Sequence, residues 1–236
     1  MKKNEVMRTN TQTTKQKDAN CFQNTASIIT LALLICSFIF LLSPIFALSS
    51  QALTTPKKYN NVYDLFLDRN DYPPDEQYKD GTGQFRVLQE QPILHIEINP
   101  MIMKGDFKSA YHEETKRAIL YGIYKTFIHT KIDKIKVTAI PMEFYINNSR
   151  TKRIKKKVNS FHKTITISRQ EALTLIQKTL GVSSFTDLVA PSFYKETFIA
   201  FTNSDIYKNI LYNGKKYHPG LDNFFILLER YSTQTK

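Results

Sequence analysis

Hydrophobic and polar positions follow two different periods from residue 93 onward. Residues 93–99 (ILHIEIN) and 134–139 (KIKVTA) alternate apolar and polar side chains one by one, as half-buried strands do. Residues 106–130 repeat their apolar side chains every three or four positions, which predicts an amphipathic helix with Asp106 as a candidate N-terminal cap. The pattern therefore predicts a strand, a long helix and a second strand, in that order.

The next segments extend this order. Residues 142–146 continue as a strand after a bend at Pro141, and residues 161–167 alternate again. The sequence SRQE at 168–171 has the spacing of a capping box, so we expect a helix to begin there and to end at Gly181. Further helices are expected at 204–214 and 221–232.

The predicted fold class is α+β, with the order β-α-β-β-α and extra C-terminal helices. Such an order indicates a sandwich with helices on one face of a mostly antiparallel sheet. It resembles a ferredoxin-like plait with one strand missing or disguised, an architectural analogy that implies no function. Residues 60–70 are expected to form a short helix, and residues 71–83, with paired prolines and glycines, a loop. We expect residues 49–92 to be a linker and residues 93–236 to form the folded domain.

An uncharged apolar segment lies between a basic tail, residues 1–25, and the linker. Residues 26–48 comprise 23 residues without a charge, enough at about 1.5 Å per residue to cross a hydrocarbon core of about 30 Å. A buried helix of a soluble protein usually keeps a polar stripe, which argues against that alternative. Two interpretations stay open: an uncleaved transmembrane anchor, or a signal peptide cleaved near Ser49 or Ala52.

The distribution of Lys and Arg predicts the orientation of this segment. Five such residues precede it, and nearby on its other side are Lys57 and Lys58. Because basic flanks stay in the cytoplasm, we expect a single-pass membrane protein with a cytoplasmic N-terminus and an extracytoplasmic domain. Cleavage would instead release the same domain by secretion. The two cysteines, Cys21 and Cys36, lie outside the domain, which excludes a disulfide scaffold and a Cys-based zinc site there.

The formal net charge of +12 is concentrated in one stretch. Between Glu143 and Glu171 there are eight basic residues and no acidic one. Six cations within residues 150–157 cannot be buried without a large desolvation cost, so we expect them on the loop or tip of a hairpin. The residues expected to contact an anionic partner are Arg150, Lys152, Arg153, Lys155, Lys156, Lys157 and Lys163.

Three interpretations of this basic stretch stay open. It could be a solvated loop without a partner. It could contact an anionic component of the cell envelope, such as lipid headgroups, a cell-wall polymer or an acidic protein surface. It could also bind nucleic acid, since KRIKKK is a basic cluster. Export argues against nucleic acid, except in DNA-handling machinery that works outside the inner membrane.

The sequence contains no recognisable catalytic or metal-binding motif. No two of the five histidines lie closer than 17 positions, which excludes HExxH and HxH patterns. Two SxxK matches, at 149–152 and 160–163, lack the accompanying motifs of penicillin-recognising enzymes. We therefore expect no cofactor and no metal, and favour a membrane-tethered, exported binding or scaffold domain of the cell envelope over an enzyme. The alternatives are an exported hydrolase with an unrecognised active site and a DNA-handling component of an envelope machine.

Overall fold

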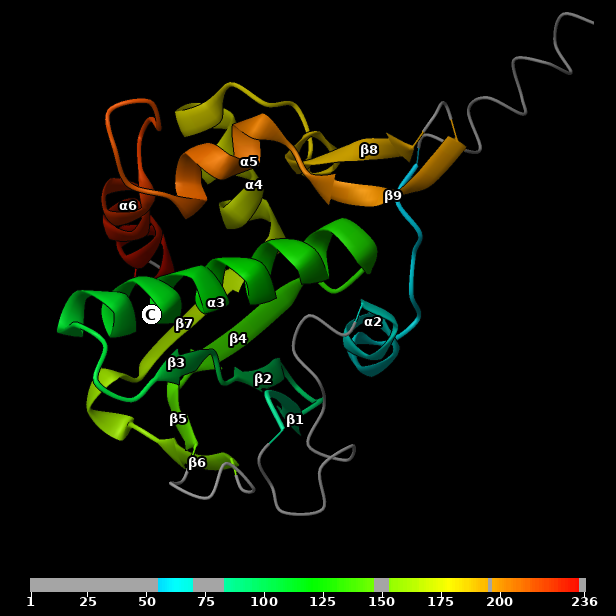
Figure 1. The fold of residues 1–236 in the computed structure, drawn as a ribbon. Helices are drawn as coiled ribbons and strands as arrows, with labels where there is room; N and C mark the ends of the chain where they lie inside the picture. The colour runs from blue at the N-terminus through cyan, green and yellow to red at the C-terminus, as the bar shows by residue number, and fades with distance from the viewer. Residues whose placement is uncertain (1–54, 70–82, 147–152, 195–196, 234–236) are drawn as a thin grey trace, which may run out of the picture. The chain divides into compact units, whose positions relative to one another are not determined.

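The computed structural model describes residues 55–69, 83–146, 153–194 and 197–233. A compact unit spans Pro56–Lys236, and its described residues form a mixed α+β fold (Figure 1). Its α-helices are α2 (Val62–Arg69), α3 (Lys108–His129), α4 (Arg169–Leu180), α5 (Asp205–Leu211) and α6 (Leu221–Thr233). Its strands are β1 (Phe85–Gln89), β2 (Leu94–Ile98), β3 (Met101–Met103), β4 (Lys134–Ala139), β5 (Met142–Ile146), β6 (Arg153–Lys157), β7 (Lys163–Ser168), β8 (Val189–Tyr194) and β9 (Thr197–Asn203).

A four-stranded sheet with the order β1-β2-β4-β7 carries the main core. β2 and β4 are parallel neighbours connected through α3, while β1 and β7 pair antiparallel at the two edges. Figure 1 shows α3 lying along this sheet. Gly122 permits the close approach, because a Cβ there would lie 2.8 Å from Val137 Cγ1 and 2.9 Å from Ile98 Cδ1. At Gly122 the backbone of α3 is thus close to side chains of β2 and β4.

A second, three-stranded sheet with the order β3-β5-β6 continues from the first. β2 leads into β3 past Pro100, and β4 leads into β5 past Pro141, so both central strands bend at a proline. Backbone hydrogen bonds from Ile140 N to Ile98 O (3.0 Å) and from Met142 N to Pro100 O (2.8 Å) hold the two bends together. The parallel pair therefore runs through both sheets, as β2–β4 and then as β3–β5.

The range 49–92, expected as a linker, contains α2 and β1. Phe66 of α2 stacks on Phe85 of β1 with ring centroids 4.1 Å apart, and both side chains are fully buried. The chain before α2 is held at the C-terminal end of α3. There Tyr59 N donates to His129 O (2.8 Å), and His129 Nδ1 donates to Lys57 O (2.7 Å). Folded structure thus begins well before residue 93.

Several sequence predictions are confirmed. The alternating segments form β2, β4, β5 and β7, and the helical ones form α3, α4, α5 and α6. The capping box is present: Glu171 N donates to Ser168 Oγ (3.2 Å), and Ser168 N donates to Glu171 Oε2 (2.8 Å). Gly181 ends α4 in the left-handed conformation, with φ 68°.

Other expectations differ from the structure. Asp106 does not cap α3: the N-cap residue is Phe107, and no side-chain hydrogen bond caps this end. A ferredoxin-like plait splits its first β-α-β unit with an intervening strand, whereas β2 and β4 pair directly. The sequence pattern did not predict β1, β3 or the hairpin β8–β9. The α+β class holds, and the specific analogy does not.

Candidate anion-contact site

The described part of the basic stretch, residues 153–157, forms the strand β6, which corrects the prediction of a loop or hairpin tip for these residues. β6 pairs antiparallel with β5, from Met142 opposite Lys157 to Ile146 opposite Arg153. Pairing with β5 provides partners for the backbone N–H and C=O groups of β6 on one side. The position of β6 at the sheet edge leaves room for charged side chains, and Lys is common on such edges. Arg150 and Lys152 lie outside the described residues, and the structure describes only the backbone of Arg153.

The three lysines of β6 have different environments. Lys155 and Lys157 project from one face of the strand and Lys156 from the other, because strand side chains alternate. Lys156 is exposed, and the other two are half-buried. Across the small sheet, Lys155 is in register with Phe144 of β5, which is in register with Met103 of β3. Lysines and apolar side chains thus share one face.

Lys157 belongs to a buried cluster around Glu97. The Glu97 carboxylate is 4% exposed, and its Oε1 lies 2.6 Å from Lys157 Nζ, 2.9 Å from Arg86 Nη2 and 3.1 Å from Asn99 Nδ2. Burial alone would raise the pKa of Glu97. The hydrogen bonds from Lys157 and Asn99, together with the Lys157 and Arg86 charges, outweigh it and hold that pKa below its ordinary value. Lys157 thus neutralises a buried carboxylate.

Lys163 is also held within the fold. Its Nζ lies 2.8 Å from Glu229 Oε1 and 5.4 Å from the ring centroid of Phe225, both on α6. Together with the pair Lys116–Asp222 (2.5 Å) it lines a groove of about 450 Å³ between α3 and α6. Two ion pairs therefore connect α6 to α3 and to the start of β7.

The sheet face opposite α3 carries a polar row. His95 Nε2 lies 2.9 Å from Thr138 Oγ1, which lies 2.8 Å from Thr164 Oγ1. Burial lowers the pKa of His95, and the Lys136 charge lowers it further, against the opposite effect of Glu97. His95 is therefore neutral at physiological pH and bridges strands. Among the described residues, no three His, Cys, Asp or Glu side chains are arranged to hold a metal ion.

The turn between β3 and α3 presents two apolar side chains to solvent. Asp106 N donates to Met103 O (3.2 Å), and Gly105 has φ 99°, so the chain reverses tightly here. Phe107 is 85% exposed and Met103 56% exposed. The sequence pattern did not indicate either residue as a contact residue, although Phe107 stands outside the apolar repeat of the helix that follows it.

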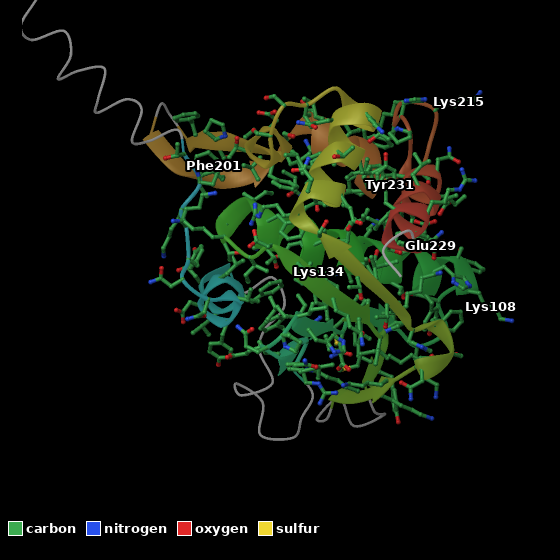
Figure 2. The ribbon with its side chains drawn as sticks, turned by 180° about the vertical axis from the view of Figure 1, so that it is seen from behind. Lys108, Lys134, Phe201, Lys215, Glu229 and Tyr231 are labelled. Atoms are coloured by element: carbon green, nitrogen blue, oxygen red, sulfur yellow. The ribbon has the colours of Figure 1, made fainter. Side chains whose placement is uncertain are left out.

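Lysines surround this turn. Lys104 N donates to Phe144 O (3.0 Å), and Lys104 Nζ lies 4.8 Å from the ring centroid of Tyr145, which joins the turn to β5. Lys108, the first residue of α3, is exposed and projects away from the ribbon (Figure 2). We call the region formed by Met103, Lys104, Phe107, Lys108, Lys155 and Lys156 the basic end.

Two carboxylates lie beside the basic end. Asp106 is exposed in the turn, and Glu143 of β5 is directly opposite Lys156. Glu143 Oε1 accepts a hydrogen bond from Tyr111 Oη (2.6 Å), which, together with burial, raises the pKa of Tyr111 to about 12. The basic end thus combines four described lysines with the carboxylates of Asp106 and Glu143 beside them.

A larger groove of about 740 Å³ lies near the start of α2 and the connection between β1 and β2. Its acidic lining residues are Glu90 and Asp133, beside Lys131 and Lys134. No Ser, Thr, Cys or His is among the described residues that line it. The described lining of this groove is therefore made of amide, carboxylate, lysine, tyrosine and apolar side chains.

Comparisons with known proteins give no relative for this chain. No known protein family, no curated protein and no solved structure matches it. Within the described part of the chain, no helix has the length and apolar character needed to cross a membrane. The apolar segment 26–48 lies outside the described residues.

Proposed function

We propose that this chain is a membrane-tethered, exported binding or scaffold domain of the cell envelope that contacts an anionic partner through its basic hairpin, by which we mean β5, β6 and the residues between them in the sequence. The observation that carries the proposal is the exposed Lys156 and its neighbour Lys155 on an edge strand, close in the fold to Lys104 and Lys108. In the sequence, Arg150 and Lys152 lie between β5 and β6, and Arg153 is the first residue of β6. Each cation near an anionic surface contributes about 1 kcal/mol, so together they favour association.

The tether in this proposal is the segment 26–48. Its uncharged length and the basic tail before it favour a single-pass anchor with a cytoplasmic N-terminus. If the segment is instead cleaved near Ser49 or Ala52, the same domain is secreted and its basic hairpin keeps its role.

The competing proposals are an exported hydrolase and a DNA-handling component. For a hydrolase, the best-placed titratable pair is His95 and Glu97 on the polar sheet face. However, Glu97 Oε1 accepts from three donors and its pKa is lowered, so Glu97 is held as a carboxylate and does not supply a proton. This arrangement favours a structural role and therefore a binding domain.

Export predicts the location of the C-terminus. A reporter enzyme that is active only outside the cytoplasm, fused after Lys236, should be active in cells. The same fusion with residues 26–48 deleted is the control and should be inactive, because the deletion removes the uncharged apolar segment that the proposal makes responsible for export. Activity of a cytoplasm-specific reporter at the same position would contradict export.

The basic hairpin predicts salt-dependent binding to a polyanion. We expect Lys155→Gln with Lys156→Gln to weaken binding of the full chain, in neutral detergent, to soluble polyphosphate by roughly 10- to 30-fold. The affinity should be measured at several salt concentrations. Because salt screens the lysines, it should weaken polyphosphate binding by the parent more than binding by the variant. Loss of binding to DNA alone, with polyphosphate binding unchanged, would favour the DNA-handling alternative.

The matched control is Lys215→Gln with Lys216→Gln. These two adjacent lysines are exposed on the connection between α5 and α6, where Figure 2 labels Lys215, and their replacement removes the same charge from the chain. If net charge alone governs binding, both double variants will weaken it equally, and the proposal of a specific basic hairpin fails.

A further inference from the structure

Resting on the proposed function, we infer that the anionic partner is a lipid bilayer surface. In this inference Phe107 and Met103 enter the acyl-chain boundary. Lys104, Lys108, Lys155 and Lys156 contact the anionic headgroups. The proposed contact surface therefore consists of two apolar side chains, Met103 and Phe107, and the four lysines around them.

The exposure of Phe107 is the first support. At 85% it is the most exposed of the large apolar side chains in the described residues. It stands at the N-cap of α3 and makes no capping hydrogen bond, where Ser, Thr, Asp or Asn would stabilise the helix. Met103, 56% exposed, lies at the other side of the same turn. An exposed apolar pair with no evident structural role indicates an interaction site.

The lysines around this pair, taken with its apolar side chains, indicate which class of anionic partner fits this surface. A polyanion such as nucleic acid or a phosphate-rich cell-wall polymer would attract the lysines but offers no apolar medium for Phe107. A bilayer with anionic lipids offers both, and surface-binding elements combine Phe or Leu with Lys in this way. The long aliphatic part of a Lys side chain can lie beside the acyl chains while its ammonium group reaches the headgroups. The combination of charge and exposed apolar area therefore favours lipid.

The length of chain before the domain is the second, independent support. Eight peptide steps separate Leu48 from Pro56, which reach at most about 29 Å whatever their conformation. A membrane-embedded 26–48 would thus keep the start of the domain near the bilayer. Such a tether raises the local concentration of lipid around the domain, so that a weak surface contact becomes populated.

The two attachment points constrain the orientation of the domain. The tether joins at the C-terminal end of α3, where Tyr59 N bonds to His129 O, and Phe107 lies at its N-terminal end. α3 has 22 residues and is therefore about 33 Å long. The chain from Leu48 to Tyr59 can reach at least as far, so both attachment points can meet one bilayer, for example with α3 inclined towards the membrane plane.

The absence of tryptophan from the chain permits a direct test. Full-length Phe107→Trp, reconstituted into vesicles of phosphatidylglycerol and phosphatidylcholine with brominated acyl chains, should lose most of its indole emission by contact quenching. High salt should restore much of that emission, because it screens the lysines. The matched control is Ile226→Trp, at a position 47% exposed on α6, whose emission should be unchanged by bromination.

Further variants separate this inference from the proposed function. Adding Lys155→Gln and Lys156→Gln to Phe107→Trp should reduce the quenching. If these lysine variants weaken polyphosphate binding while Phe107→Trp is not quenched, the lipid inference is overturned and the proposed function stands. Equal quenching at Phe107→Trp and Ile226→Trp also overturns it, since contact would then not be specific to the basic end. The lysine variants could instead promote aggregation and leave both binding and quenching unchanged. The native lysines would then serve to protect a strand edge from aggregation, and both proposals would fail.

Discussion

Replacing Arg169 with alanine is expected to lower the free energy of unfolding by about 2–4 kcal/mol. The half-buried Arg169 guanidinium donates hydrogen bonds to three carbonyl oxygens at and just beyond the C-terminal end of α3. The acceptors are Phe127 (2.8 Å), Thr130 (2.7 Å) and Ile132 (2.9 Å). The last carbonyls of a helix lack partners within the helix, so the side chain of one element completes the hydrogen bonding of another.

The guanidinium also packs against aromatic rings. Its Cζ lies 4.8 Å from the ring centroid of Phe127 and 5.4 Å from that of Phe185. Lysine cannot reproduce the planar set of donors or the stacking, so Arg169→Lys should recover less than half of the loss. Burial lowers the pKa of Arg169, but an arginine stays charged across the accessible pH range. The loss should therefore be almost independent of pH.

Urea denaturation of a fragment beginning at Pro56 measures this effect, because the compact unit Pro56–Lys236 contains the hydrophobic core that the structure describes. Arg230→Ala, at an exposed position of α6, is the matched control, and we expect it to change stability by less than about 1 kcal/mol. Equal stability of Arg169→Ala and the control would mean that water replaces the guanidinium at the three carbonyls.

Sequence periodicity predicted those elements whose signal is local. β4 and β7 alternate because one face of each strand is buried against the helices, and Ser168 and Glu171 meet within one turn. β6 has no such signal, since its RIKKK sequence has a single apolar residue. It is a strand because β5 pairs with it, and this tertiary effect overrides intrinsic strand preference.

The sequence showed that the candidate site is basic. It did not show which of the cations are paired with groups inside the fold. Lys157 meets Glu97 across 60 positions, and Lys163 meets Glu229 across 66. Arg169, the last basic residue of the same acid-free stretch, binds carbonyl groups about 40 positions away. Such contacts depend on the sheet order and on the bends at Pro100 and Pro141. Exposure of Phe107 likewise follows from where α3 begins, which the repeat alone did not specify.

Removing the Lys157 charge is expected to destabilise the domain by about 2–3 kcal/mol at neutral pH. Lys157→Met leaves the Glu97 carboxylate, 4% exposed, with Arg86 and Asn99 as its donors. Arg86 is 42% exposed and compensates only in part. Lys156→Met is the matched control: the neighbouring side chain is exposed, so we expect a change within about 0.5 kcal/mol. This contrast separates the lysine that supports the fold from the lysines proposed to bind a partner.

The pH dependence identifies Glu97 as the cause. In the parent protein the pKa of Glu97 is lowered on folding, so its contribution to stability is complete above the unfolded value of about 4.5. That contribution decreases as the pH falls through the folded pKa. Lys157→Met removes the strongest of the groups that lower this pKa. The stability difference between parent and variant should therefore be full at pH 7 and shrink in acid, which urea denaturation at pH 7 and below about pH 4 would measure.

A double variant provides the decisive comparison. Glu97→Met with Lys157→Met removes both charges and places two apolar side chains of similar size in the same space. Replacing both members of a buried ion pair by apolar residues is often neutral or stabilising, whereas removing one member is costly. We therefore expect the double variant to be more stable than Lys157→Met and to lose the acid-dependent difference. A double variant as unstable as Lys157→Met at every pH would mean that Lys157 acts by packing its side chain, and not by neutralising Glu97.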